Sequence, residues 1–272
     1  MLCRMIRMFL APAVLMLWPL SAAMAQGLSQ SDILDGQLRP GWQMQSGHHL
    51  SALHLRLAPE WKTYWRAPGD AGIPPSFDWS GSENLKSVRF HWPAPEVFHT
   101  NGMQSVGYHH ELVLPIEVEA RDPSQPVTLR ARVDLGVCKD ICMPASLDLT
   151  ADLMPPGQPD QTIRTALKAR PATAGEAGVS GLPCKVEPIR DGLRLTDLER
   201  VLYFENWVVV EPGLPGVWVS EAEVERQGER LRAIVDMVPP SAEPFALVRG
   251  DIVMTVIGPA GRAVELRGCP AG

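Results

Sequence analysis

Two cysteines four positions apart, Cys138 and Cys142, are the residues of this sequence best suited to chemistry. They lie in the segment DLGVCKDICMP, residues 134–144, at the end of a β-rich stretch. Cysteines at this spacing can meet across one turn of backbone, and short exposed disulfides exchange more readily than buried ones. Exchange also needs a thiolate, which Lys139 favours and Asp140 opposes. The spacing therefore favours thiol–disulfide exchange at this turn.

Two other interpretations of the pair stay open. It can be a small structural disulfide at a hairpin, or it can bind a soft cation such as Cu(I), with Met103 or Met143 as a further ligand. Zinc fits less well, because it takes four ligands and the seven histidines show no partner motif at zinc-finger spacing. The pairs His48-His49 and His109-His110 alternate sides of a strand, so neither is expected to form a metal site by itself.

The first 25 residues have the pattern of an export signal. Two arginines precede an apolar run from Met8 to Leu20, and Ala23 to Ala25 is the small-residue pattern that signal peptidase cleaves. We expect a signal peptide over residues 1–25, a mature chain that begins at Gln26, and a periplasmic location. No later run of about 18 apolar residues occurs, so no membrane span is expected in the mature chain.

The four cysteines beyond this leader form an even set, which in an exported protein indicates disulfides. Cys184 and Cys269 bracket the C-terminal third of the chain, so we expect them to form a structural bridge, while Cys138 and Cys142 form the chemical one. In the chain-entropy model, a bridge that closes so long a loop contributes roughly 4–5 kcal/mol. A second redox pair is the alternative.

Charge argues against nucleic acid as a partner. The full chain has 25 Lys and Arg against 31 Asp and Glu, a formal net charge of −6. No basic stripe or run occurs, whereas nucleic-acid-binding proteins gather Lys and Arg on one face. We therefore expect no nucleic-acid partner.

Short strands are the elements that must position the first cysteine pair. Pro and Gly are frequent, with 26 and 23 residues, and no long stretch has a 3.6-residue apolar period. This pattern predicts an antiparallel β-sandwich with the cysteines at the turn between its last two strands. The predicted strands are His49–Ala58, Leu85–Trp92, Leu112–Glu119, Val127–Leu135 and Ser146–Leu153.

A second β-rich unit follows a break in this pattern. Prolines between 155 and 159 end the strands, Asp160–Ala169 has the pattern of one short helix, and residues 171–181 have linker composition. We therefore expect an all-β protein of two β-sandwich domains, 26–154 and 182–272, joined by a helix and linker at 155–181. The second domain's predicted strands are Leu193–Leu195, Val201–Phe204, Trp207–Val210, Val217–Val219, Leu231–Met237, Phe245–Val248, Ile252–Ile257 and Ala263–Leu266.

Three segments, in order, resemble the N-terminal periplasmic domain of the DsbD-type thiol:disulfide interchange proteins. They are EWKTYWRAPGDAGIPP at 60–75, YHHELVLPI at 108–116 and GVCKDICMP at 136–144. The resemblance implies an immunoglobulin-like fold for the first domain, with Cys138 and Cys142 as the cycling pair. It also implies thioredoxin-like periplasmic partners. No organic cofactor is expected, because the two sulfurs carry the electrons themselves.

The sequence departs from the better-known DsbD domain in two ways. That domain spaces its cysteines by five residues, whereas three lie between Cys138 and Cys142. The shorter spacing is similar to the suppressor-of-copper-sensitivity B branch, whose exported region continues into a second β-domain. No membrane-spanning electron-transfer domain and no thioredoxin-like domain follow in this sequence. We therefore expect a standalone form with a separate membrane electron donor, and the direction of electron flow stays open.

The resemblance also indicates residues that could cover the cysteines. In the DsbD domain a short cap loop carries an aromatic over them, and the corresponding stretch here is roughly Phe98 to Tyr108. The cap aromatic has no clean match, because Asn101 stands near its place. Phe98 and Met103 are candidates instead, and a core role is the alternative for Phe98.

Aromatics of the first matched segment, Trp61, Tyr64 and Trp65, are further candidates to line the cysteine face, although such residues are more often core in a β-sandwich. The leading hypothesis is a periplasmic protein that passes reducing equivalents between protein partners through Cys138 and Cys142. A Cu(I)-binding or copper-tolerance protein and a non-catalytic interaction module are the alternatives.

Overall fold

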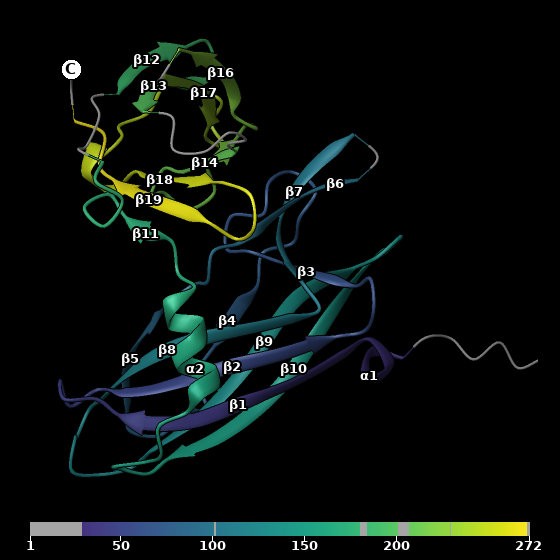
Figure 1. The fold of residues 1–272 in the computed structure, drawn as a ribbon, viewed down its shortest axis with the longest axis vertical. Helices are drawn as coiled ribbons and strands as arrows, with labels where there is room; N and C mark the ends of the chain where they lie inside the picture. The colour runs from purple at the N-terminus through teal and green to yellow at the C-terminus, as the bar shows by residue number, and fades with distance from the viewer. Residues whose placement is uncertain (1–28, 101, 180–183, 201–206, 229, 271–272) are drawn as a thin grey trace, which may run out of the picture.

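The computed structural model describes residues 29–100, 102–179, 184–200, 207–228 and 230–270. The expected signal peptide, Asn101 and the predicted strand at 201–204 therefore lie outside the described residues. Figure 1 shows two β-rich units, which we call the N-terminal unit (α1 and β1 to β10) and the C-terminal unit (β11 to β19), with α2 between them in the chain.

Two sheets form the N-terminal unit, with strand orders β1-β2-β8-β5 and β10-β9-β3-β7-β6, and β4 pairs with β9. All of its strand pairs are antiparallel. The elements are α1 (Gln30–Ile33), β1 (Leu34–Gln43), β2 (His49–Leu57), β3 (Lys62–Tyr64), β4 (Ser76–Asp78), β5 (Leu85–Phe90), β6 (Glu96–Thr100), β7 (Met103–His109), β8 (Glu111–Ala120), β9 (Val127–Cys138) and β10 (Cys142–Leu153).

Alternating residues place the core of this unit between the two sheets. On β9, every second residue from Val127 to Val137 is buried, and the residues between them face the other side of the sheet. Leu112, Leu114 and Ile116 supply the same alternation on β8. The predicted antiparallel β-sandwich is confirmed, and this protein is all-β.

Helix α2 (Gln161–Lys168) covers the outer face of the first sheet. Its buried residues Ile163 and Ala166 pack on Leu50 and Ala52 of β2 and on Val113 of β8. Because β2 is covered on both faces, almost all of its residues are buried, and the strand reads as continuous rather than half-exposed. Among the described residues, no helix is both long enough and apolar enough to cross a membrane.

Two further sheets form the C-terminal unit, with orders β11-β19-β18-β14 and β12-β13-β17-β15, and β16 pairs with β17. β11 runs parallel to β19 and the other pairs are antiparallel. The elements are β11 (Ala172–Thr173), β12 (Lys185–Ile189), β13 (Gly192–Arg200), β14 (Trp207–Glu211), β15 (Trp218–Val219), β16 (Glu223–Gln227), β17 (Arg230–Val238), η1 (Arg249–Asp251), β18 (Val253–Ile257) and β19 (Ala263–Arg267).

One predicted strand of this unit is wrong. Phe245–Val248 pairs with no strand and is irregular, although Phe245 and Leu247 pack against the core. Alternating apolar residues report burial on one side, and a segment can be buried in that way without a hydrogen-bonded neighbour.

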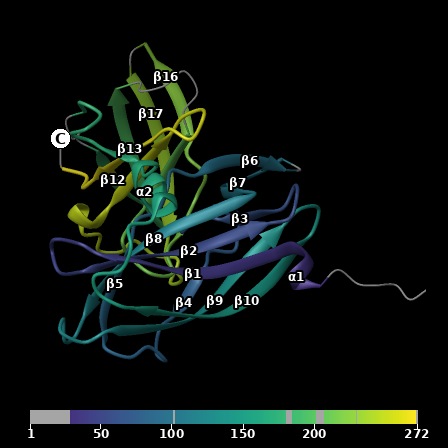
Figure 2. The same cartoon turned by 60° about the horizontal axis from the view of Figure 1, so that its bottom comes forward.

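The two units share a packed interface. Trp207 and Val209 of β14, Ile257 of β18 and Ala263, the first residue of β19, pack against the core of the N-terminal unit. Their sheet therefore has apolar residues on both faces, since Val208 and Val256 face the C-terminal core. Figures 1 and 2 show the β6–β7 hairpin reaching out alongside the C-terminal unit.

Candidate redox site

The cysteine pair closes the hairpin formed by the two longest strands, β9 and β10, of 12 residues each. Cys138 ends β9, Cys142 begins β10, and the two are directly opposite each other in the strand register. They form a disulfide with their Cα atoms 4.1 Å apart. The ladder of paired residues below them holds the two cysteines together whether or not the sulfurs are bonded.

The two cysteines of the bridge differ in exposure. Cys138 is only 1% exposed, whereas Cys142 is exposed and lies beside Ile141, which is 64% exposed at the tip. An incoming thiolate must approach a sulfur along the S–S axis, so access decides which sulfur it attacks. This geometry makes Cys142 the accessible end of the disulfide.

Tyr64 contacts both sulfurs. Its hydroxyl donates a hydrogen bond to Sγ of Cys138 at 2.8 Å and lies 3.4 Å from Sγ of Cys142. β3 brings it there, because Lys62 of that strand pairs with Cys138, and residues two apart on a strand share a face. The Tyr64 side chain is 2% exposed, and burial raises the pKa of its phenol, which keeps it a donor at neutral pH.

Two glycines make the space that Tyr64 occupies. A Cβ atom at Gly136 would lie 3.2 Å from the Tyr64 ring and 2.7 Å from Cβ of Ile73. A Cβ atom at Gly72 would lie 2.9 Å from the other side of the ring. In addition, the hydroxyl of Thr63 donates to the carbonyl of Gly136 at 2.9 Å, which fastens β3 to β9 beside the cysteines.

Lys62 and Phe98 extend this outer face away from the sulfurs. The Lys62 ammonium lies 4.9 Å from the centre of the Phe98 ring and donates to the hydroxyl of Thr100 at 3.1 Å. The Phe98 ring also contacts His109, with the two ring centres 4.2 Å apart. Burial lowers the pKa of Lys62.

At the hairpin tip, Lys139 pairs with Glu60 at 2.5 Å. The hydrogen bond and charge of each partner raise the pKa of Lys139 and lower that of Glu60. Lys139 is thus already engaged with a carboxylate and is less free to stabilise a cysteine thiolate than its place in the sequence suggests.

Comparison with known families identifies the unit that holds this site. The family described as thiol:disulfide interchange protein DsbD, N-terminal, matches residues 32–153, which contain both cysteines and Tyr64. Over these residues the N-terminal unit is similar to the DsbD N-terminal domain family.

Two solved structures resemble the chain. The N-terminal periplasmic domain of ScsB from Proteus mirabilis has 23% sequence identity and a TM-score of 0.62, over 88% of this chain and 92% of that one. It therefore shares the fold across both units. The reduced DsbD N-terminal domain from Neisseria meningitidis has 16% identity and a TM-score of 0.30, over 48% of this chain and 91% of that one, which is too low to support a statement about the fold.

The aromatic residues suggested by the DsbD resemblance divide between two faces. Tyr64 points to the sulfurs, but Trp61 and Trp65 lie in the core because β3 and the residues beside it alternate sides. Tyr108 is also in the core, where its hydroxyl donates to the carbonyl of Pro93 at 2.8 Å. Trp65 and Tyr108 are therefore not part of the rim of the site.

The stretch compared with the DsbD cap loop is the β6–β7 hairpin. Phe98 is 7% exposed and lies on the outer face with Lys62, so it belongs to the same surface as the cysteines. Met103 begins β7 and is 53% exposed. Sequence reasoning did not single out Lys62, because the strand Lys62–Tyr64 was not predicted; its place two residues before Tyr64 becomes a signal only once that strand is known.

The remaining cysteines pair as expected: Cys184 and Cys269 form the second disulfide, with their Cα atoms 5.3 Å apart. Both are 2% exposed or less and lie in the C-terminal core. The histidines of interest bind protein groups, since His48 pairs with Glu117 at 2.6 Å and His109 with Glu96 at 3.1 Å. Within the part of the chain that is described, no cluster of three or more His, Cys, Asp or Glu could hold a metal ion.

Proposed function

We propose that this protein is a periplasmic thiol–disulfide exchange protein that passes reducing equivalents between protein partners through Cys138 and Cys142. The match of residues 32–153 to the DsbD N-terminal family supports exchange as the chemistry. The observation that carries the proposal is the asymmetry of the bridge, with Cys142 exposed and Cys138 buried under the Tyr64 hydroxyl.

The proposed exchange has two balanced steps. A partner thiolate attacks Sγ of Cys142, the bond between the two cysteine sulfurs breaks, and its electron pair goes to Sγ of Cys138. A second partner thiolate then attacks the partner's own sulfur in the mixed disulfide and releases Cys142 as a thiolate. The partner is oxidised to a disulfide and this protein is reduced to a dithiol. Delivery to an acceptor disulfide runs through the same steps in reverse.

Tyr64 assists the first step in this proposal. As the disulfide breaks, negative charge develops on Sγ of Cys138, and the phenol already donates a hydrogen bond to that atom. Hydrogen bonds to charged acceptors are stronger than those to neutral ones, so the contact gains strength as the sulfur becomes a thiolate. Tyr64 therefore lowers the barrier to opening the bridge.

Thioredoxin-like periplasmic proteins are the proposed partners, together with a separate membrane electron donor. The surface beside Cys142 is suited to protein contact, because its neighbour Ile141 is 64% exposed and Ile73, beside Gly136 of the same hairpin, is 43% exposed. Exposed apolar side chains around a reactive group are typical of surfaces that dock another protein. The periplasmic location of the ScsB domain supports the same compartment for this protein.

We further propose the division of the chain into a signal peptide at 1–25, a redox domain at 26–154, a connector at 155–181 and a second domain at 182–272. The two main cores support this division, with β11 of the connector pairing with β19 of the second domain. Cys184–Cys269 then has a structural role, because it is buried and joins the start of the 182–272 domain to its end.

Thiol labelling at a series of glutathione or dithiothreitol potentials tests the function. Mass spectrometry of the labelled peptides should show reversible opening of Cys138–Cys142 while Cys184–Cys269 stays closed. A Cys138–Cys142 bridge that opens only with denaturation would contradict the proposal and support a structural role.

A further inference from the structure

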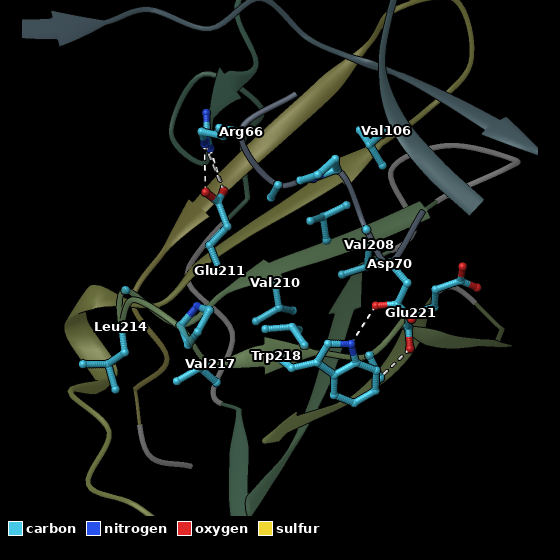
Figure 3. Close-up of a pocket in the computed structure, with 18 of the residues that line it drawn as sticks. Arg66, Asp70, Val106, Val208, Val210, Glu211, Leu214, Val217, Trp218 and Glu221 are labelled. Carbon is cyan, nitrogen blue, oxygen red and sulfur yellow. Dashed lines mark hydrogen bonds and ion pairs between the residues drawn. The ribbon is translucent and has the colours of Figure 1, made fainter. Parts of the chain in front are cut away.

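The C-terminal unit makes ion pairs and hydrogen bonds to residues 66–70, the segment that follows Tyr64. Two residues after Tyr64, the guanidinium of Arg66 makes a bidentate pair with Glu211, through Nε at 2.9 Å and Nη2 at 2.8 Å. The same Nη2 donates to Glu265 at 2.8 Å. Burial alone would lower the pKa of Arg66, but these carboxylates raise it. Arg66, Glu211 and Glu265 thus form a partly buried ion cluster, shown in part in Figure 3. It joins a loop of the N-terminal unit to two strands of the C-terminal unit.

A second contact holds the same segment four residues further along. The indole N–H of Trp218 donates to the carboxylate of Asp70 at 2.7 Å, and Figure 3 shows the two side chains meeting across the cavity between the units. This cavity has a volume of about 470 Å³ and is lined by residues 66–70 on one side and 208–221 on the other. In addition to the shared apolar interface, both ends of the segment 66–70 thus bind the C-terminal unit, through Arg66 and Asp70.

The β6–β7 hairpin also contacts the C-terminal unit. The backbone N–H of Gln104, on β7, donates to the carboxylate of Glu221 at 3.1 Å. His99, on β6, lies beside Trp207 with ring centres 6.2 Å apart. Phe98 belongs to this hairpin, which pairs with β3, so the hairpin next to the Tyr64 strand also contacts the C-terminal unit.

Only one residue separates Arg66 from Tyr64, so contacts at Arg66 can fix the position of Tyr64. Trp65 separates Tyr64 from Arg66, is fully buried in the core, and has the Arg66 guanidinium 4.3 Å from its ring. Gly72 and Ile73, which pack around the Tyr64 ring, follow Asp70 by two and three residues. Fixing Arg66 and Asp70 therefore limits the movement of the residues on both sides of Tyr64.

We propose that the C-terminal unit positions the Tyr64 hydroxyl on the sulfur of Cys138 through the Arg66–Glu211–Glu265 cluster and the Asp70–Trp218 contact. Arg66 is a positioning residue in this proposal, since it touches neither sulfur. The proposal rests on the exchange function proposed above and gives the C-terminal unit a part in it. Small displacements of a group that stabilises developing charge cost rate, because the hydrogen bond depends steeply on distance and angle.

A double-mutant cycle between Arg66 and Tyr64 tests this proposal. Arg66→Ala should slow the opening of Cys138–Cys142 by dithiothreitol at least about threefold, and Tyr64→Phe should slow it further, because it removes the hydroxyl altogether. In the Tyr64→Phe background, Arg66→Ala should have no further effect. A purely structural role predicts instead that the two effects multiply, and that result would overturn the proposal.

Matched variants control for the loss of an ion pair. Arg194→Ala removes another bidentate pair, with Asp236, that lies within the C-terminal unit, and it should leave the rate unchanged. Arg66→Glu combined with Glu211→Arg should restore at least part of the rate. Trp218→Phe removes one hydrogen bond with little change in volume and should give a smaller slowing in the same direction. Failure of the exchanged pair to restore any rate would contradict the role of the cluster.

A spectroscopic measurement separates this proposal from the exchange function. The chain has three tyrosines, so 13C-tyrosine labelling gives few resonances, and Tyr64→Phe assigns the one of interest. Arg66→Ala should shift the Tyr64 resonance and Arg194→Ala should not. If Tyr64 shifts but no variant, the native protein included, exchanges its disulfide, the positioning stands and the exchange function fails. An unmoved Tyr64 resonance and an unchanged rate in folded Arg66→Ala would overturn the positioning and leave the exchange function intact.

Discussion

The hydroxyl of Tyr64 lies 2.8 Å from the buried sulfur of Cys138, a residue 74 positions later in the chain. The contact joins the sulfur that must accept electrons to a donor that burial keeps protonated. β3, a strand of three residues, is fastened to β9 beside the cysteines by backbone pairing and by the Thr63 hydroxyl, which holds Tyr64 in this position.

Tyr64→Phe should slow the opening of Cys138–Cys142 by a small thiol about tenfold, because a hydrogen bond to a developing thiolate is worth on the order of 1.4 kcal/mol. Stopped-flow labelling of the released thiols would measure the rate. Tyr108→Phe is the matched control, since it removes another buried phenol hydrogen bond, to Pro93, away from the sulfurs. Equal slowing in both variants would show that the effect is not specific to the contact with Cys138.

The two disulfides should open in a fixed order. Cys142 is exposed and its bridge closes a short loop, whereas Cys184 and Cys269 are 2% and 1% exposed and are separated by 85 residues. Burial and the larger entropic stabilisation from closing a long loop both protect Cys184–Cys269 from reduction. Mild reductant followed by alkylation and peptide mass spectrometry should label Cys138 and Cys142 first. Prior labelling of Cys184 would reverse the assigned roles.

Acid should weaken the attachment of α2 through Asp160. Burial alone would raise the pKa of this carboxyl, but hydrogen bonds from Arg39 and from the N–H groups of Thr162 and Ile163 lower it overall. Because the folded pKa lies below the unfolded one, the stabilisation is complete above the unfolded value of about 3.9 and is lost as pH falls through the folded value. The helix should thus loosen in acid.

Asp160→Asn tests this pH dependence, because an amide oxygen can still cap α2 but carries no charge. Denaturant unfolding between pH 6 and pH 3 should show a shallower fall in the free energy of unfolding for Asp160→Asn than for the native protein. At neutral pH, Asp160→Ala should lower the free energy of unfolding by about 1 kcal/mol more than Asp160→Asn does, because the alanine cannot cap the helix. Parallel curves for the native and Asn proteins would contradict the role given to the charge.

Much of the fold could be predicted from the sequence because several strands are long and alternate strictly. β2, β8, β9 and β10 were expected within a few residues, and α2 lies within the predicted Asp160–Ala169. In the N-terminal unit, β1, β3, β4, β6 and β7 were missed, since Pro40 and Gly41 interrupt β1, β3 and β4 have three residues each, and β6 and β7 carry polar side chains in a hairpin. Short strands of this kind are defined by their neighbours rather than by their own pattern.

The candidate site was predictable in its chemistry but not in its geometry. The spacing of Cys138 and Cys142 pointed to the reactive bridge, yet nothing in it showed which sulfur is exposed. Tyr64 and Trp65 are adjacent aromatics, and only the direction of β3 decides that the first faces the sulfurs. Arg66 meets carboxylates 145 and 199 residues away, and pairing over such distances cannot be read from local pattern.

The site of attack tests the central claim most directly. Cys138→Ser and Cys142→Ser proteins would each be incubated with a thioredoxin-like protein that keeps only its attacking cysteine, in the presence of an oxidant, and the cross-linked peptides would be mapped. Cys138→Ser should trap a stable mixed disulfide through Cys142, because the exposed sulfur remains and the resolving thiol is gone. Cys142→Ser should trap little or none, because Sγ of Cys138 is buried beneath Tyr64. A cross-link carried by Cys138, or none from either variant, would contradict this account.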